Sequence, residues 1–291
     1  MFALASSTLF LFFCFDKDLT FVVKFCHNKF MTNTKVAVVT GASSGIGLAV
    51  ANLLGQNGYK VYGLSRREVK NQNFESLVCD ITDQEMAKST LDMILQKEGK
   101  IDVLINNAGR GMSGAFESIG LQNRRAEFEL NYFALTNMCE YVLPSMRQNG
   151  GGRIVNISSL AGVFPIPYQS GYSASKFAVN GFSMALRNEV KNFGVWVSAV
   201  MPGDTKTGFT DARIKTHNQN YTNLDKSVKK MEKDERKGMP SEKIAKTVLK
   251  LLKSKRPKAL VSVGFKNKFL VFLSKILPNN IMLFVVNKMY N

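Results

Sequence analysis

One glycine-rich stretch, Thr-Gly-Ala-Ser-Ser-Gly-Ile-Gly at residues 40–47, constrains the fold more than any other part of the chain. It follows a short apolar run and precedes a helical pattern. A strand, a glycine turn and a helix in that order open a βαβ unit that binds a dinucleotide. We expect Gly41 to adopt a backbone conformation that a side chain would forbid. Gly45 is expected to let a pyrophosphate approach the main chain, and Gly47 to let the helix pack close to the strand.

Apolar strands alternate with helical patterns from Lys35 onward. Nearly continuous apolar strands separated by helices are typical of a parallel sheet covered on both faces. The sequence therefore predicts an α/β fold over residues 31–264, a single-domain Rossmann-like doubly wound parallel sheet of about seven strands with helices on both faces. The expected strands are 36–39, 60–65, 76–80, 101–106, 152–157, 195–200 and 259–263, and the expected helices include 82–96, 128–146, 172–192 and 242–252, the last with Ser241 as its N-cap.

The composition narrows the chemistry that a chain of 291 residues with 45% hydrophobic content can carry. Its four cysteines are scattered without the spacing of a disulfide framework or a metal site, which predicts reduced thiols and a cytoplasmic protein. The chain has only two histidines, and neither belongs to a group of ligand residues. We therefore expect no metal site and no Ser/His/Asp chemistry.

The first 30 residues differ from the rest of the chain. Residues 1–15 are apolar and uncharged, with no basic segment before them and no clear cleavage site before Asp16. The run is also short for a membrane span. We expect residues 1–30 to lie outside the fold, with Met31 as an alternative translation start. A membrane anchor or an uncleaved signal is the alternative interpretation.

Positive charge is concentrated in the last part of the chain, whose overall net charge is +17. Residues 211–291 hold 19 Lys and Arg against 6 Asp and Glu, and no acidic residue follows Glu242. Such asymmetry favours an anionic partner, although a solvated lysine-rich helix face is the alternative. The basic and apolar tail 265–291 has helical spacing broken at Pro278, and neither piece can span a bilayer. It could lie on an anionic membrane surface, or pack on the domain or on a partner subunit; no nucleic-acid module is found, so no nucleic acid is expected.

Tyr172 and Lys176 are four residues apart, so a helix places them on one face. A lysine cation beside a phenol stabilises the phenolate and lowers its pKa, which lets the tyrosine exchange a proton with a substrate oxygen. Ser159 lies thirteen residues before Tyr172, after the expected strand 152–157, where its hydroxyl could hold a carbonyl oxygen. Ser158 is the competing candidate, and the thirteen-residue interval selects Ser159.

The chain resembles the short-chain dehydrogenase/reductase family from about Lys35 to Val263. The resemblance implies that Tyr172 is the general acid/base and that Ser159 orients the substrate carbonyl. Lys176 would bind the nicotinamide ribose and tune Tyr172, and Asn131 would hold a water in a proton relay. The matching pieces are residues 40–47, Asn106-Asn107-Ala108-Gly109, Asn131, Ser159, Tyr172, Lys176 and Pro202-Gly203.

The same resemblance implies further cofactor contacts. The segment 106–109 would line the adenosine side of the groove and brace the sheet, Asp80 would contact the adenine, and residues 202–207 would cover the nicotinamide. The expected cofactor-binding residues are Gly41, Ser43, Ser44, Gly45, Ile46, Gly47, Arg66, Asp80, Asn107, Ala108, Gly109, Tyr172, Lys176, Pro202, Gly203, Thr205 and Thr207.

The end of the second strand favours NADP(H) over NAD(H). A carboxylate there would bind the ribose 2′-hydroxyl and repel a 2′-phosphate, but the chain has no acidic residue before Glu68. Arg66 can instead pair with a phosphate, and Ser43 can add a hydrogen bond. The alternative is that Arg66 and Arg67 are simply solvated.

These residues predict an NADP-dependent oxidoreductase that interconverts a carbonyl and an alcohol. The substrate pocket is expected from residues 111–114, the stiff apolar stretch 163–168 and the segment after Thr207, with residues 208–238 as a mobile lid. An apolar wall favours a hydrophobic steroid-, retinoid- or acyl/lipid-like substrate. We expect a homodimer or homotetramer. The alternative function is an NADP(H)-binding regulatory or redox-sensing protein with little turnover.

Overall fold

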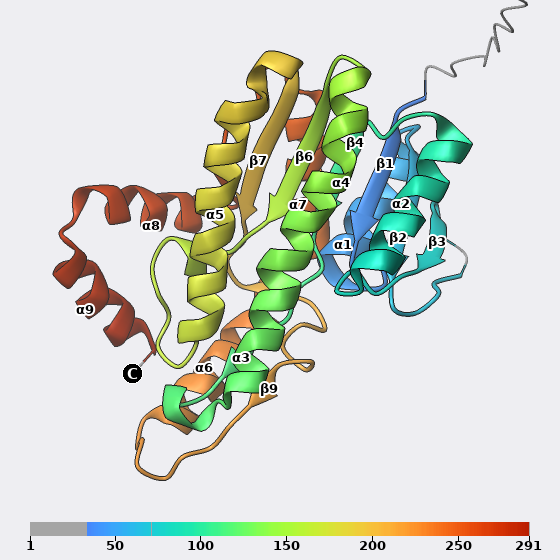
Figure 1. Cartoon of the computed structure of the whole chain (residues 1–291). Coiled ribbons are helices and arrows are strands. Elements are labelled where there is room, and N and C mark those ends of the chain that lie inside the picture. Colours follow the sequence, from blue (N-terminus) through green and yellow to red (C-terminus); the bar gives the residue numbers. More distant parts are fainter. Residues whose placement is uncertain (1–33, 71, 291) are drawn as a thin grey trace, which may run out of the picture. The chain divides into compact units, whose positions relative to one another are not determined.

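The computed structural model describes residues 34–70 and 72–290 (Figure 1). The expected extension 1–30 therefore lies outside the described residues. Within them, the main sheet has the strand order β11-β7-β6-β4-β1-β2-β3, and every neighbouring pair is parallel. Its strands are β1 (Val36–Thr40), β2 (Lys60–Ser65), β3 (Glu75–Val78), β4 (Val103–Asn106), β6 (Gly152–Ile157), β7 (Val195–Met201) and β11 (Leu260–Ser262).

Helices cover both faces of this sheet, as the alternation of strands and helices predicts. In β1, Val36 and Val38 pack toward one face and Ala37 and Val39 toward the other, because successive strand residues point to opposite sides. The first face is covered by α2 (Gln84–Glu98), α4 (Ala134–Gln148) and α5 (Ser170–Val190), and the second by α1 (Gly45–Gln56) and α7 (Ser241–Lys253). The predicted doubly wound parallel sheet is confirmed.

The helix expected at 128–146 is interrupted at the point where it carries a site residue. It begins earlier as α3 (Leu121–Phe128), continues through a π-helical turn at Glu129–Phe133, and becomes α4. Asn131 lies in this turn, and hydrogen bonds from its side chain to Arg110 and Ser175 favour the wider turn. Turns of this type commonly occur at functional sites.

The expected N-cap at Ser241 is wrong by one position. Ser241 is the first residue of α7, and the cap position is Pro240, which has no side chain able to accept a hydrogen bond from the helix. Pro240 belongs to β10 (Met239–Pro240), which pairs with β8 (Thr205–Lys206). This strand pairing, rather than a capping side chain, fixes where α7 begins.

The expected lid 208–238 contains more regular structure than its sequence indicates. It includes β9 (Ile214–Lys215), which pairs with β5 (Met112–Ser113), and α6 (Leu224–Arg236). On α6, Leu224, Val228 and Met231 are buried at intervals of four and three residues. The helix therefore has an apolar face, although charged residues elsewhere on it hide this face from a composition-based reading.

The C-terminal tail forms two helices, α8 (Phe265–Ile276) and α9 (Asn279–Tyr290), on either side of Pro278. Leu270 and Leu273 of α8 pack with Met282 and Val286 of α9 and with Phe164 of the domain. One side of the tail is thus part of the fold. Among the described residues, no helix has both the length and the apolar character needed to cross a bilayer.

Candidate active site

A cavity of about 530 Å³ opens where several strands of the sheet end. Gly41 follows β1, Asn107 follows β4, Ser158 follows β6 and Pro202 follows β7, and all four residues line the cavity. The carboxyl ends of parallel strands are where α/β sheets bind their ligands. This cavity therefore contains the candidate site.

Ser159, Tyr172 and Lys176 line this cavity together. Tyr172 lies in the first turn of α5, and Lys176 follows one turn later on the same face. The Nζ atom of Lys176 donates a hydrogen bond to the carbonyl oxygen of Ile157 at 3.0 Å and lies 5.7 Å from the centre of the Tyr172 ring. Ser159 precedes a 3₁₀ turn, and its Oγ accepts from the amide of Ala161 at 3.1 Å. The fold thus brings the three predicted residues together in one cavity.

Burial is the largest influence on the pKa values of Tyr172 and Lys176. It raises the pKa of Tyr172 to about 12, although hydrogen bonding to Ser159 and the charge of Arg213 act to lower it. Burial also lowers the pKa of Lys176 to about 8, and the charge of Glu127 partly opposes this effect. The net lowering of the Tyr172 pKa that the sequence predicts is therefore not found, because loss of hydration outweighs the charges nearby. The phenol is therefore protonated at neutral pH.

Asn131 supports the site without lining the cavity. Its Oδ1 accepts from the amide of Arg110 at 2.9 Å, and its Nδ2 donates to the carbonyl oxygen of Arg110 at 3.0 Å and to Ser175 Oγ at 3.1 Å. A Cβ on Gly109 would lie 3.2 Å from Asn131 Oδ1 and 3.7 Å from Lys176 Nζ. Both polar atoms therefore lie against Gly109, while the proposed water relay stays a prediction.

The glycine turn has the geometry that its sequence predicts. Gly41 and Gly45 have φ values of +67° and +55°, a region that side chains disfavour. A Cβ on Gly47 would lie only 2.3 Å from the carbonyl oxygen of Gly41, so helix and strand approach closely there. Asn107 Nδ2 donates to the carbonyl oxygens of Thr40 and Gly41 at 3.1 and 3.2 Å, which braces the turn. Gly47 packs behind the turn and does not line the cavity.

The turn and its surroundings fit a dinucleotide. Ser44 precedes α1, and no side-chain hydrogen bond caps this helix among the described residues, which suits a phosphate at the helix start. Arg66 and Arg67 are exposed at the rim, at the end of β2. The expected cofactor residues that line the cavity are Gly41, Ser43, Ser44, Gly45, Ile46, Arg66, Asp80, Asn107, Ala108, Gly109, Tyr172, Lys176, Pro202, Gly203, Thr205 and Thr207.

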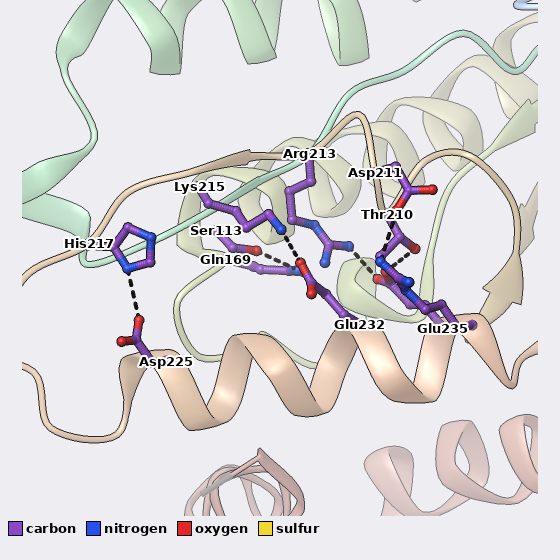
Figure 2. A network of polar contacts seen from close by, with 11 residues as sticks. Ser113, Gln169, Thr210, Asp211, Arg213, Lys215, His217, Asp225, Glu232 and Glu235 are labelled. Atoms are coloured by element: carbon purple, nitrogen blue, oxygen red, sulfur yellow. Dashed lines mark hydrogen bonds and ion pairs between the residues drawn. The ribbon is translucent and has the colours of Figure 1, made fainter.

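An ion pair beside Tyr172 was not predicted from the sequence. The guanidinium of Arg213 pairs with the carboxylate of Glu235 on α6, and Thr210 Oγ1 donates to the same carboxylate at 2.6 Å (Figure 2). Arg213 and Glu235 line the cavity. The ring of Phe209 lies between the two centres, 5.7 Å from the guanidinium of Arg213 and 5.8 Å from the Tyr172 ring. The cavity wall is therefore charged as well as apolar.

The signal for this pair lies in alternating charges rather than in a motif. Arg213, Lys215 and His217 occupy alternate positions of an extended segment and point toward α6 (Figure 2). Lys215 pairs with Glu232, and His217 Nδ1 lies 3.0 Å from Asp225 Oδ1. Three basic side chains at alternate positions of residues 213–217 match three acidic side chains on α6, and this match indicates that the two segments pack together. The sequence does not say which of the three pairs is buried.

One further sequence-based expectation for the site needs correction, and one residue must be added. Residues 111–114 do not line the cavity, because Met112 and Ser113 pair with β9 instead. Glu127 is a buried carboxylate that no motif indicates, and burial raises its pKa to about 7. Within the described residues, no cluster of His, Cys, Asp and Glu could hold a metal ion.

Comparison with known proteins places this geometry in a family. The model of the short chain dehydrogenase family matches residues 35–218. The chain is 40% identical over 263 residues to the 3-ketodihydrosphingosine reductase of Bacteroides thetaiotaomicron, an alignment that covers 88% of this chain and 98% of the relative.

Solved structures give the same result, and two of them contain a nicotinamide cofactor. A short chain dehydrogenase/reductase from Burkholderia phymatum in complex with NAD matches with a TM-score of 0.71 and 25% identity, over 79% of this chain and 89% of that chain. A metagenomic short-chain oxidoreductase in complex with NADP matches with a TM-score of 0.64 and 28% identity, over 79% and 96%. The chain therefore belongs to the short-chain dehydrogenase/reductase family and is a nicotinamide-dependent oxidoreductase.

Proposed function

We propose that the protein is an NADP-dependent reductase of a lipid-like ketone. The observation that carries the proposal is that Ser159, Tyr172 and Lys176 line one cavity with the glycine turn 41–47. A proton donor and a nucleotide cradle in the same cavity suit the transfer of a hydride and a proton to one carbonyl group.

The protonation state of Tyr172 suits the role of proton donor in the reductive direction. The nicotinamide, when bound, supplies the hydride for carbonyl reduction. Because the pKa of Tyr172 is raised to about 12, the phenol carries its proton at neutral pH and can donate it to the substrate oxygen. Ser159 holds that oxygen, and the charge of Lys176 stabilises the phenolate that remains. Alcohol oxidation, the reverse reaction, needs the phenolate and is favoured at high pH.

The preference for NADP(H) rests on the rim of the cavity. Arg66 and Arg67 are exposed there, and Ser43 lies in the glycine turn nearby. Two guanidinium groups can bind a 2′-phosphate, and no carboxylate follows β2 directly to repel it. NAD(H) is the less favoured cofactor.

The substrate class rests on the cavity and on the relatives. Phe164, Ile166 and Leu270 give the substrate side an apolar wall, and Arg213 and Glu235 add a polar end. A long-chain ketone with a polar head suits both features. The relative from Bacteroides thetaiotaomicron is a reductase of such a compound by its name. We propose a substrate of this kind, a long-chain ketone close to 3-ketodihydrosphingosine.

The proposed assembly is a cytoplasmic homodimer or homotetramer. A groove between α4 and α5 is lined by apolar side chains that include Leu143, Phe182 and Phe193. Phe133, which directly precedes α4, and Phe177 and Met184 on α5 are exposed, with exposed fractions of 49%, 42% and 42%. A second copy could cover these residues.

The test of the proposed function is NADPH consumption over ketones of increasing chain length, with NADH measured in parallel. We expect long-chain ketones and NADPH to give the highest kcat/KM. Tyr172→Phe should lower turnover by about 10² or more, because the proton donor is lost, while NADPH binding stays unchanged. Tyr221→Phe is the matched control, because Tyr221 is exposed and does not line the cavity. Undiminished turnover in Tyr172→Phe would contradict the mechanism.

A further inference from the structure

Figure 1 shows α8 and α9 at the edge of the fold. Both helices expose large apolar side chains. On α8 these side chains recur at intervals of four, three and four residues, which places them along one side of the helix. Exposed apolar groups gathered in this way are typical of a surface that contacts a partner or a membrane. This C-terminal apolar surface consists of Phe265 (85% exposed), Phe269 (53%), Phe272 (57%), Ile276 (60%), Ile281 (47%), Leu283 (49%) and Phe284 (59%).

The surface is fixed on the fold by the opposite side of the same helices. Leu270 and Leu273 of α8 pack with Met282 and Val286 of α9, and this cluster includes Phe164 from the loop before α5. α8 is therefore apolar on two sides, of which only one is used inside the protein. Solvation alone does not explain the second apolar side, because a solvated face is normally polar.

The charges around the surface point to an anionic partner. Lys266, Lys268, Lys275 and Lys288 lie on the same two helices and are exposed. No Asp or Glu follows Glu242, and eleven Lys and Arg do. Apolar side chains bordered by lysines suit a bilayer that contains anionic lipids, since the rings and chains enter the interface and the ammonium groups meet the lipid phosphates.

A second copy of the chain fits this surface less well. In a two-fold dimer each copy presents the same patch to the other, and neither α8 nor α9 carries an Asp or Glu to pair with the partner's lysines. Like charges brought together in this way oppose association. The groove between α4 and α5 remains the surface for self-association.

The same helices border the active-site cavity. Leu270 of α8 and Tyr290 of α9 line it together with Tyr172. Met289 of α9 also lines the cavity and is 36% exposed, so it lies where the cavity meets solvent beside the C-terminal apolar surface. The rim of the cavity and the C-terminal apolar surface thus belong to one structural unit.

We propose that the C-terminal apolar surface docks on an anionic membrane and that the lipid-like substrate enters the cavity from the bilayer past Met289. The docking is independent of the reaction. The entry route rests on the proposed reductase function. Docking would spare a long apolar chain the passage through water between the bilayer and the cavity.

The first test is binding of the full chain to phosphatidylcholine vesicles with and without phosphatidylserine. The triple variant Phe272→Gln/Ile276→Gln/Phe284→Gln removes exposed apolar groups that do not line the cavity. We expect the wild type to sediment with anionic vesicles and the triple variant to bind at least about tenfold more weakly. The control Met93→Gln/Leu121→Gln changes apolar side chains of similar exposure, 45% and 54%, on other helices and should bind like the wild type.

The second test compares two substrates. With a long-chain ketone embedded in anionic vesicles, the triple variant should lose kcat/KM about tenfold, in step with its binding. With a short water-soluble ketone, its activity should equal that of the wild type, which shows that the fold and the site are intact. If the wild type reduces no ketone, the proposed function fails, while the vesicle test still decides the docking.

Three results would overturn the docking proposal. One is a wild-type chain that does not bind anionic vesicles, and another is a triple variant that binds them as the wild type does. The third is a triple variant that changes from an oligomer to a monomer in the absence of vesicles, which would assign the surface to a second copy of the chain.

Discussion

The guanidinium of Arg213 and the carboxylate of Glu235 form an ion pair in which the arginine side chain is only 1% exposed and the glutamate side chain 17%. The hydrogen bond comes from Nη2, and the Nε and Nη1 atoms of Arg213 have no hydrogen-bond partner among the described residues. The carboxylate of Glu235 is thus the main group that offsets the lost hydration of the buried Arg213 charge. Removing one partner of a buried pair costs more than forming the pair gains.

Glu235→Gln is therefore expected to lower the free energy of unfolding by about 3 kcal/mol, measured by urea denaturation. Glu232→Gln is the matched control. Its partner Lys215 is 39% exposed, so the loss should stay below about 1 kcal/mol. Equal losses in the two variants would show that Arg213 finds another source of compensation.

Glu127 should make stability depend on pH in a definite direction. Burial raises its pKa from 4.5 to about 7 in the folded protein. Below pH 4.5 the group is protonated in both states, and above pH 7 the folded state holds a charge that burial disfavours. Stability from this group is therefore lost as pH rises from about 4.5 to 7, by about 3 kcal/mol. Glu127→Gln should flatten the unfolding free energy over this range, apart from the slope due to Asp204, whose pKa is also raised, to about 6. The exposed Glu140→Gln should retain the wild-type slope.

The same substitution should also shift the pH profile of activity. The charge of Glu127 raises the pKa of Lys176, which burial otherwise lowers to about 8. In Glu127→Gln the pKa of Lys176 should fall further, so the alkaline limb of kcat/KM for ketone reduction should move to lower pH. A purely structural role for Glu127 would lower activity at every pH and leave the midpoint where it is.

The fold was largely predictable because it follows from local patterns. Short apolar runs predicted where the strands lie, and the glycine turn predicted the connection from β1 to α1. The interval from Ser159 to Tyr172 selected a serine that lines the cavity, although Ser158 lines it too, with its hydroxyl donating to the carbonyl oxygen of Lys176 at 3.2 Å. In these cases the residues that form the pattern in the sequence are the same residues that form the structural feature.

The unpredicted parts depend on contacts between distant segments. The Arg213–Glu235 pair joins two segments whose partners the sequence does not identify. The pKa of Tyr172 follows from how deeply the first turn of α5 is buried, which helical spacing cannot give. Asn131 lies in a π-helical turn and bonds from there to Arg110 and Ser175, and no residue pattern shows such a turn.

Gly47→Ala should damage both the fold and cofactor binding. The added Cβ would lie 2.3 Å from the carbonyl oxygen of Gly41 and 2.4 Å from Asn107 Nδ2, so backbone must move. We expect a loss of stability of about 2 kcal/mol and weaker NADPH binding. Gly181→Ala is the control, because nothing lies within 4 Å of its added Cβ and alanine favours the helix α5. Thermal unfolding with and without NADPH measures both effects, and equal behaviour of the two variants would contradict the close packing at Gly47.

Arg66→Ala should change which cofactor the enzyme prefers. Arg66 is exposed at the cavity rim after β2, where a 2′-phosphate would lie if NADP(H) binds as we propose. A charge-assisted hydrogen bond contributes about 1.5–3 kcal/mol, so kcat/KM for NADPH should fall by about 10- to 100-fold. The value for NADH should hardly change, because NADH has no phosphate at this position. Arg256→Ala removes an exposed positive charge that does not line the cavity and should leave both values unchanged. An equal loss with both cofactors would mean that Arg66 supports the local fold rather than the phosphate, and the preference for NADP(H) would then need another origin.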